Sequence, residues 1–191
     1  CARDEQPATL KTFSVARQPS PMADAGGRLD LLAFRSEDGA LESASSGNGD
    51  SISVRLVRKR EYHLYLLGNG TGIPDSISGE RDFLQTRTGF EDNDPELPLM
   101  FSSQVTYRFG EEITTIPLKR YLSKISIGEI SCTLPEEIPC KVTMIAVMNA
   151  AGSIPLSGVP DDNWLIAGYG VAGEYTSEQH AYPFYQENGT V

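Results

Sequence analysis

Three cysteines are the residues of this 191-residue chain whose positions first suggest chemistry. Cys1 begins the sequence and is followed by a polar stretch without an apolar run. A mature chain that begins at cysteine is what processing of a bacterial lipoprotein leaves, with acyl chains on the sulfur and the new amino terminus. Several acyl chains hold a protein stably on a membrane, whereas one binds only marginally. We therefore expect Cys1 to be lipidated; the alternative is an arbitrary or proteolytic start.

The other two cysteines, Cys132 and Cys140, enclose a short proline-containing loop between two strand-like runs. If Cys1 carries lipid, an even pair remains, as is usual in secreted proteins. The two arms of a hairpin can bring their Cα atoms within the roughly 7 Å that a disulfide requires. Closing so small a loop would stabilise the fold by about 2–3 kcal/mol. We expect a disulfide here, with two unpaired thiols as the alternative. Neither His63 nor His180 lies at zinc-ligand spacing from these cysteines.

The sequence offers little for catalysis. The acidic residues of 91–96 could bind Ca²⁺, but they lack the spacing and glycine of an EF-hand, so a solvated turn is favoured. His63 lies inside a strand-like run and is interpreted as a strand residue rather than a base. Nucleophile-elbow, Walker, zinc-protease and dinucleotide motifs are missing from the sequence. We expect no catalytic residue, no metal and no cofactor.

The overall charge also limits the possible partners. The formal net charge is −10 and the isoelectric point is near 4.6, which argues against nucleic acid, because phosphate binding requires concentrated Lys and Arg. A local basic cluster at Arg55 and 58–60 is interpreted as a solvated strand end or turn. Apolar residues make up 39% and charged residues 22%, which is typical of a globular chain. No apolar run approaches the length of a transmembrane helix.

The elements that must position the cysteines and the other candidate residues are predicted to be mainly strands. Residues 51–57 alternate between apolar and polar side chains, which is typical of a half-buried strand. Residues 42–50 are expected to form a loop, and 75–85 have helical or turn character. Many short strands without alternating helices predict an antiparallel sandwich or barrel. The further expected strands are 29–34, 61–67, 104–109, 112–118, 121–130 and 141–148.

Four segments in order resemble the fimbrillin family of Bacteroidales surface lipoproteins. An aromatic strand ends in an asparagine, a proline-methionine segment follows, then an apolar-Pro-Leu-x-Arg strand, and finally a strand ending in asparagine and small residues. This chain has Pro-Leu-Met-Phe where many members have Pro-Met followed by Ser or Thr and Gly. The resemblance covers about two-thirds of the chain. Its four segments are Tyr62–Asn69, Pro98–Ser102, Ile116–Ile125 and Met148–Ala151.

This resemblance implies a fold, a division into domains and a function. Fimbrillins fold as two transthyretin-like Greek-key β-sandwich domains and polymerise into surface fimbriae. The implied division is a leader with a removable first strand (1–28), an N-terminal β-sandwich domain (29–156), and a linker with part of a second β domain (157–191). Fimbrillins are exported as lipoproteins, so the implied partners are other fimbrial subunits and the outer membrane, through lipid on Cys1.

In shaft subunits of that family, a protease cuts after an arginine and removes the first strand. The groove then accepts a strand donated by a neighbouring subunit, whereas anchor subunits keep the lipid. Residues 9–16 match a removable strand here, and Arg17 and Arg28 are the candidate cleavage sites. The alternative is that both are ordinary surface arginines.

A second function also remains open at this point. The chain would then be a membrane-anchored adhesin module that binds a glycan or a peptide, through exposed aromatic side chains in a groove. The only aromatic cluster that the sequence offers for this role is Tyr169, Tyr175, Tyr182 and Tyr185.

Overall fold

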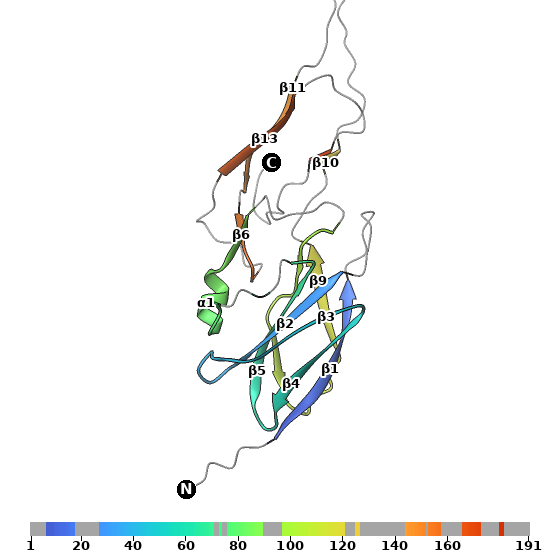
Figure 1. The fold of residues 1–191 in the computed structure, drawn as a ribbon, viewed down its shortest axis with the longest axis vertical. Coiled ribbons are helices and arrows are strands. Elements are labelled where there is room, and N and C mark those ends of the chain that lie inside the picture. The colour runs from blue at the N-terminus through green and yellow to red at the C-terminus, as the bar shows by residue number, and fades with distance from the viewer. Residues whose placement is uncertain are drawn as a thin grey trace, which may run out of the picture.

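The structure, a computed structural model, describes residues 7–17, 27–70, 73, 76–89, 97–120, 125–126, 144–151, 153–157, 166–172 and 180–181. These residues form strands and one short helix (Figure 1). The main body contains β1 (Ala8–Arg17), β2 (Arg28–Arg35), β3 (Leu41–Asn48), β4 (Ser51–Val57), β5 (Glu61–Gly68), α1 (Glu80–Gln85), β6 (Arg87–Gly89), β7 (Met100–Phe101), β8 (Val105–Arg108) and β9 (Thr115–Arg120). The later strands are β10 (Ile125–Ser126), β11 (Met144–Ala151), β12 (Ser153–Pro155), β13 (Ile166–Ala172) and β14 (His180–Ala181).

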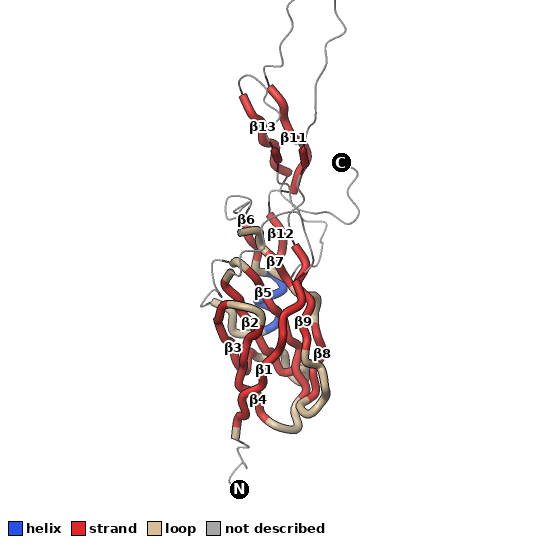
Figure 2. The backbone as a smooth tube through the Cα atoms, turned by 90° about the vertical axis from the view of Figure 1, so that its right-hand side faces the viewer, coloured by secondary structure: helices blue, strands red, loops and turns tan. Residues whose placement is uncertain are grey.

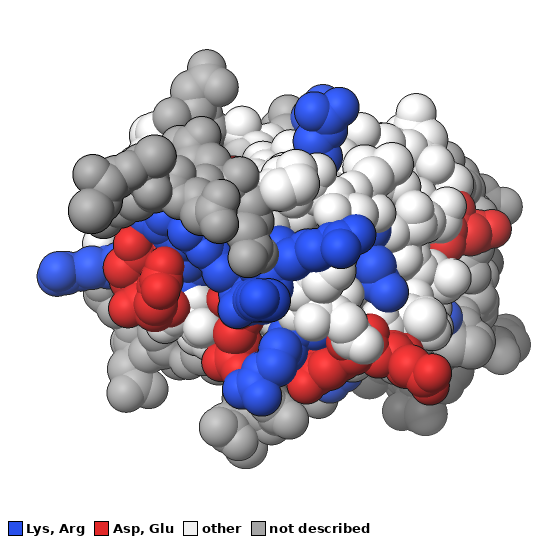
Figure 3. All heavy atoms as spheres, turned by 90° about the horizontal axis from the view of Figure 1, so that it is seen from below, with Lys and Arg blue, Asp and Glu red and all other residues white. Residues whose placement is uncertain are grey.

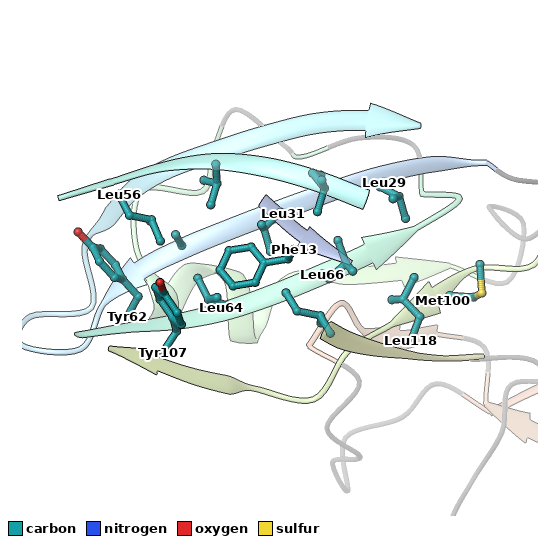
Figure 4. Packing of buried hydrophobic residues seen from close by; sticks show 14 residues of the cluster. Phe13, Leu29, Leu31, Leu56, Tyr62, Leu64, Leu66, Met100, Tyr107 and Leu118 are labelled. Carbon is teal, nitrogen blue, oxygen red and sulfur yellow. The ribbon is translucent and has the colours of Figure 1, made fainter. Parts of the chain in front are cut away.

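The main body is a β-sandwich that closes almost into a barrel. The strand order is β3-β2-β5-β7-β9-β1-β4, and β8 pairs with β5 beside this path. Strand β9 joins the two layers, because it pairs with β7 at one end and with β1 at the other. The layers β3-β2-β5-β8 and β4-β1-β9 face each other, and buried side chains fill the space between them (Figure 4). The expected all-β sandwich is therefore confirmed.

One pairing in the sandwich is not antiparallel. Strand β1 runs antiparallel to β4 but parallel to β9, from Ser14 opposite Thr115 to Arg17 opposite Leu118. Strand β1 therefore lies inside a sheet, between two strands that come from much later in the chain (Figure 2).

The expected strand at 51–57 is confirmed with the same boundaries as β4. Its apolar residues Ile52, Val54 and Leu56 are buried, whereas Ser51 and Arg55 are exposed. The alternation arises because successive side chains of a strand point to opposite faces. These three residues belong to the inner cluster, which we define as the core between the two layers, with Phe13, Leu31, Leu64, Tyr107 and Leu118 among its other members.

Strands β2 and β5 are buried on both faces. Residues 29–34 of β2 are all buried, although only Leu29, Leu31 and Ala33 point into the inner cluster. The opposite face carries Leu32 and Phe34, which lie in one cluster with Phe83 of α1. We call this second core the outer cluster; it consists of Leu32, Phe34, Tyr65, Leu67, Ile77, Phe83 and Leu156. Burial on both faces explains the apolar run from Leu31 to Phe34, since neither face of this strand requires polar residues. Asp30 is the buried exception, and it is paired with Arg28 and Ser46.

The prediction of a loop at 42–50 is wrong for most of these residues. Strand β3 pairs antiparallel with β2 from Leu41 to Asn48, and only Gly49 and Asp50 form the turn to β4. Gly49 has a φ of 97°, a conformation that favours glycine. None of the residues of β3 is buried, so the sequence shows no apolar alternation. This edge strand is therefore held by its main-chain hydrogen bonds to β2 rather than by buried side chains.

The remaining expected elements differ mainly at their ends. The helical region contains α1, and the strands expected at 104–109 and 141–148 correspond to β8 and β11. The strand expected at 112–118 begins later, at Thr115. Of the strand expected at 121–130, the structure describes only β10.

The later strands pair with each other and with the main body. Strand β11 pairs with β13, β10 pairs with β14, and β12 pairs with β6. The first two pairings join residues from both sides of position 156. The expected division into domains at this position stays a prediction.

Candidate functional site

Strand β1 occupies a position in the sandwich that we call the β1 slot, between β4 on one side and β9 on the other. Residues Ala8 to Ser14 pair with β4, and Ser14 to Arg17 pair with β9. Every second side chain of β1 points inward, and the intervening side chains are exposed. Leu10 is one of the apolar residues with a large accessible surface, at 62%. The buried side chains that flank the slot are Ile52, Val54 and Leu56 of β4, and Ile116 and Leu118 of β9.

Phe13 is the one fully buried residue of β1. Its ring meets the ring of Tyr107 from β8 edge to face, with centroids 5.2 Å apart and an interplanar angle of 86° (Figure 4). The Nζ atom of Lys11 lies 6.0 Å from the centre of the Phe13 ring and 5.8 Å from that of Tyr107. A cation at this distance from aromatic rings is attracted by their negative faces. The middle of β1 is therefore held by one ring pair with a cation beside it.

Arg17 ends β1 and is held by the turn between β3 and β4. Its guanidinium forms an ion pair with Asp50, and its Nη2 donates to the carbonyl of Gly49 at 2.6 Å. Only 12% of the Arg17 side chain is exposed, whereas Asp50 is 87% exposed. The backbone N–H of Val15 also donates to the Asp50 carbonyl, at 2.9 Å. The same turn thus binds β1 through a side chain and through the main chain.

Arg28, the other candidate cleavage site, lies at the start of β2. Its Nε is 3.0 Å from both carboxylate oxygens of Asp30, and its Nη2 donates to Ser46 at 3.2 Å. The next residue, Leu29, is fully buried and pairs with β3 and β5. The peptide bond after Arg28 therefore belongs to a central strand, whereas Arg17 is the last residue of its strand.

His63 lies in β5, as the sequence predicts. Its Nδ1 is 2.9 Å from the Glu80 carboxylate of α1, and the Tyr65 hydroxyl donates to the same carboxylate at 2.8 Å. Burial, followed by the hydrogen bond to Glu80 and its negative charge, raises the pKa of Tyr65. These contacts join α1 to the outer face of β5. Glu80 was not predicted from the sequence, although the alternation of His63 and Tyr65 along one strand face indicates that they share a neighbour.

The basic turn at 58–60 joins β4 to β5, as expected, and Arg58 and Lys59 are exposed. Nearby basic side chains are matched by carboxylates: Arg60 lies 3.0 Å from Glu42, and Arg108 lies 3.1 Å from Glu61. Acidic and basic side chains lie side by side on this end of the molecule (Figure 3).

Several sequence-predicted sites lie outside the described residues: Cys1, Cys132, Cys140, the acidic segment 91–96, Tyr175, Tyr182 and Tyr185. Tyr169 lies in β13, but its side chain is not described. Among the residues that the structure describes, no group of three His, Cys, Asp or Glu is placed to hold a metal. Within the same residues, the one helix is too short to cross a membrane.

Comparison with solved structures finds this fold in bacterial proteins described as fimbrial or as cell-adhesion proteins. A protein of Parabacteroides distasonis ascribed to cell adhesion matches with a TM-score of 0.70 at 11% identity, over 94% of this chain and 71% of that chain. The tip fimbrial protein Mfa3 of Porphyromonas gingivalis matches with a TM-score of 0.58 at 17% identity, over 92% and 67%. The fimbrial anchor protein Mfa2 of the same species matches with a TM-score of 0.53 at 18% identity, over 95% and 75%.

These likenesses agree with the resemblance to fimbrillins at the level of the fold. No protein-family model matches the sequence. No curated protein matches it either.

Proposed function

We propose that the protein is a non-catalytic cell-surface fimbrial subunit, exported as a lipoprotein, that assembles by β-strand donation between subunits. The observation that carries this proposal is the position of β1. The first strand of the chain lies between β4 and β9, yet Phe13 is its only fully buried residue. A strand held in this way can be replaced by an equivalent strand of another chain.

An empty β1 slot would be unstable by itself. Removing β1 would expose main-chain hydrogen-bonding groups of β4 and β9 together with their apolar side chains. Unpaired strand edges and exposed apolar surface both favour association with another strand. Strand addition restores the main-chain hydrogen bonds, and the alternate side chains of the added strand fill the vacated positions. The free energy of filling the slot would thus drive polymerisation.

Arg17 fits the strand boundaries better than Arg28, although the Arg28 side chain is the more exposed, at 47% against 12%. Cleavage after Arg17 would release β1 as a unit, because the strand ends at this residue. Cleavage after Arg28 would require Leu29 and the start of β2 to leave the centre of a sheet. We therefore assign processing to Arg17, and we propose that Cys1 carries the lipid that attaches the unprocessed chain to the outer membrane. The proposed partners are further fimbrial subunits, of the same or another kind.

Recovery of the protein from its native cell surface tests the export step and the cleavage step together. Intact mass and N-terminal sequencing should show either lipid on Cys1, as in an anchor or precursor, or a new terminus directly after Arg17. An unmodified Cys1 on a soluble monomer would contradict both and would favour the binding-module alternative.

A purified chain tests the assembly step. Treatment with an arginine-specific protease should remove residues 1–17 and produce larger assemblies on size-exclusion chromatography. Arg17→Lys keeps the positive charge but not the cleavage site, so this variant should stay monomeric. Arg28→Lys is the matched control and should behave like the original chain. Assembly of Arg17→Lys at the original rate would contradict the proposal.

A further inference from the structure

The contacts of β1 describe the strand that would replace it, and this inference rests on the proposed function. We infer that the β1 slot selects an incoming strand by side chain as well as by backbone. Counting from an aromatic residue that faces inward, this strand carries a cation two residues before it, an aliphatic residue two residues after it and a cation four residues after it. These are the positions of Phe13, Lys11, Val15 and Arg17.

The aromatic position provides the largest part of the selection. Phe13 is 0% exposed and packs edge to face on Tyr107, which is also 0% exposed. Both rings belong to the inner cluster, so a smaller side chain here would leave a cavity inside the sandwich. The cost of such a cavity rises with its volume. An occupant without a large ring would therefore bind much more weakly.

The two cation positions differ in what they contact. At the Lys11 position, a positive charge lies near the rings of Phe13 and Tyr107. At the Arg17 position, the guanidinium meets the Asp50 carboxylate and the Gly49 carbonyl, both in one turn of the protein. Asp50 is largely exposed, so solvent screens this pair and its contribution is modest. The two cations lie at unequal sequence separations from the aromatic residue, two residues before it and four residues after it. This asymmetric pattern also fixes the register of the strand.

Register matters because of the two faces of β1. A shift of one residue would bring Thr12 or Ser14 inward and turn the aromatic ring towards solvent. In the observed register, the outward Thr12 hydroxyl lies 2.8 Å from that of Ser53 on β4. The outward positions carry Leu10 as well as small and polar residues, so they select little, and the inward positions carry the recognition.

Peptide exchange into the cleaved protein tests the inference. The full chain is cut after Arg17, both pieces are kept together, and fluorescently labelled peptides spanning residues 8–17 are added in excess. Fluorescence anisotropy reports entry into the slot. The original peptide and Leu10→Ala, which changes only the outward face, should bind equally. The Phe13→Ala peptide should bind about 100-fold more weakly. A peptide with Thr12→Phe and Phe13→Thr has the same composition but places the ring on the outward face, and it should lose as much affinity as the Phe13→Ala peptide.

A charge exchange tests the Arg17 position separately. The Arg17→Glu peptide should bind the original protein roughly fivefold more weakly, because it faces Asp50. It should recover most of this loss with the Asp50→Lys protein, whereas the original peptide should lose affinity for that protein. Equal binding of all peptides would overturn the inference while leaving strand donation intact. No binding of the original peptide would overturn strand donation and the inference together.

Discussion

Strands β1 and β2 follow each other in the chain but are held in the sandwich in different ways. Residues 29–34 of β2 are all buried, because the inner cluster covers one face and the outer cluster covers the other. In β1, Phe13 alone is fully buried, and the other face is exposed to solvent. Both strands pair on two sides. The difference shows that pairing on two sides is common to both strands, whereas burial on both faces is a property of β2 alone. Under the proposed function, this is why β1 and not β2 is the strand that another chain replaces.

Because β2 is buried on both faces, a substitution in this strand should have the largest effect on stability. Phe34 packs against Tyr65, at 5.9 Å between ring centroids, and against Phe83, at 5.7 Å. Phe34→Ala should lower the free energy of unfolding by about 3–5 kcal/mol, through lost burial and the cavity that remains. Urea unfolding measures this change, with Phe34→Leu as the more conservative control. A loss below about 1 kcal/mol would show that the outer cluster does not support β2.

Phe13→Ala should cost somewhat less, about 3 kcal/mol, and its effect should be local. The Phe13 ring is the main buried contact of β1, whereas β2 has side chains in both the inner and the outer cluster and keeps these contacts when Phe13 is removed. Amide hydrogen exchange should therefore accelerate strongly in β1 and much less in β2. Uniform acceleration in both strands would show that β1 unfolds only with the whole sandwich, and would remove the distinction between the two.

The Arg17–Asp50 pair should make a smaller contribution. Because Asp50 is mostly exposed, we expect a coupling of about 0.5–1 kcal/mol between the two residues. A double-mutant cycle with Arg17→Gln and Asp50→Asn in the full chain measures it. The Arg35–Asp38 pair, in the turn after β2, is the matched control. A coupling that persists in 1 M salt would contradict a screened surface pair.

The smallest effect should come from pH at the helix that covers β2. Hydrogen bonds from the side chain and backbone N–H of Ser78 lower the pKa of Asp82 below its ordinary value of 3.8. A carboxyl whose folded pKa is lowered stabilises the fold above its unfolded pKa, and this stability is lost as pH falls through the folded pKa.

Thermal unfolding can detect this loss. The difference in melting temperature between the original chain and Asp82→Asn should therefore shrink as pH falls below 3.8. Ser78→Ala removes one donor and should weaken the same dependence. A difference that stays constant down to about pH 2 would contradict the assignment.

The sequence predicted some parts of this arrangement better than others, for physical reasons. Strand β4 was located at both ends because one of its faces is buried and the other is not. Strand β3 was missed because its only apolar residues besides glycine, Leu41 and Ala44, are three positions apart and give no period-two alternation to detect. The removable strand at 9–16 and the cleavage site at Arg17 were proposed through a family resemblance, and both stay predictions. Asp50 was not, since it was expected in a loop and lies 33 residues from Arg17. The lipid on Cys1 and the Cys132–Cys140 bond stay predictions.

The composition of β3 has a consequence for the open edge of the sheet. β3 lies at one end of the sheet order, and none of its residues is buried. Open strand edges invite sideways association, and polar side chains along such an edge reduce the gain from it. A chain that docked beside β3 would gain main-chain hydrogen bonds but little apolar contact. Off-pathway aggregation at this edge is thereby disfavoured. Under the proposed function, the β1 slot is then the place where an incoming strand gains both main-chain hydrogen bonds and apolar burial.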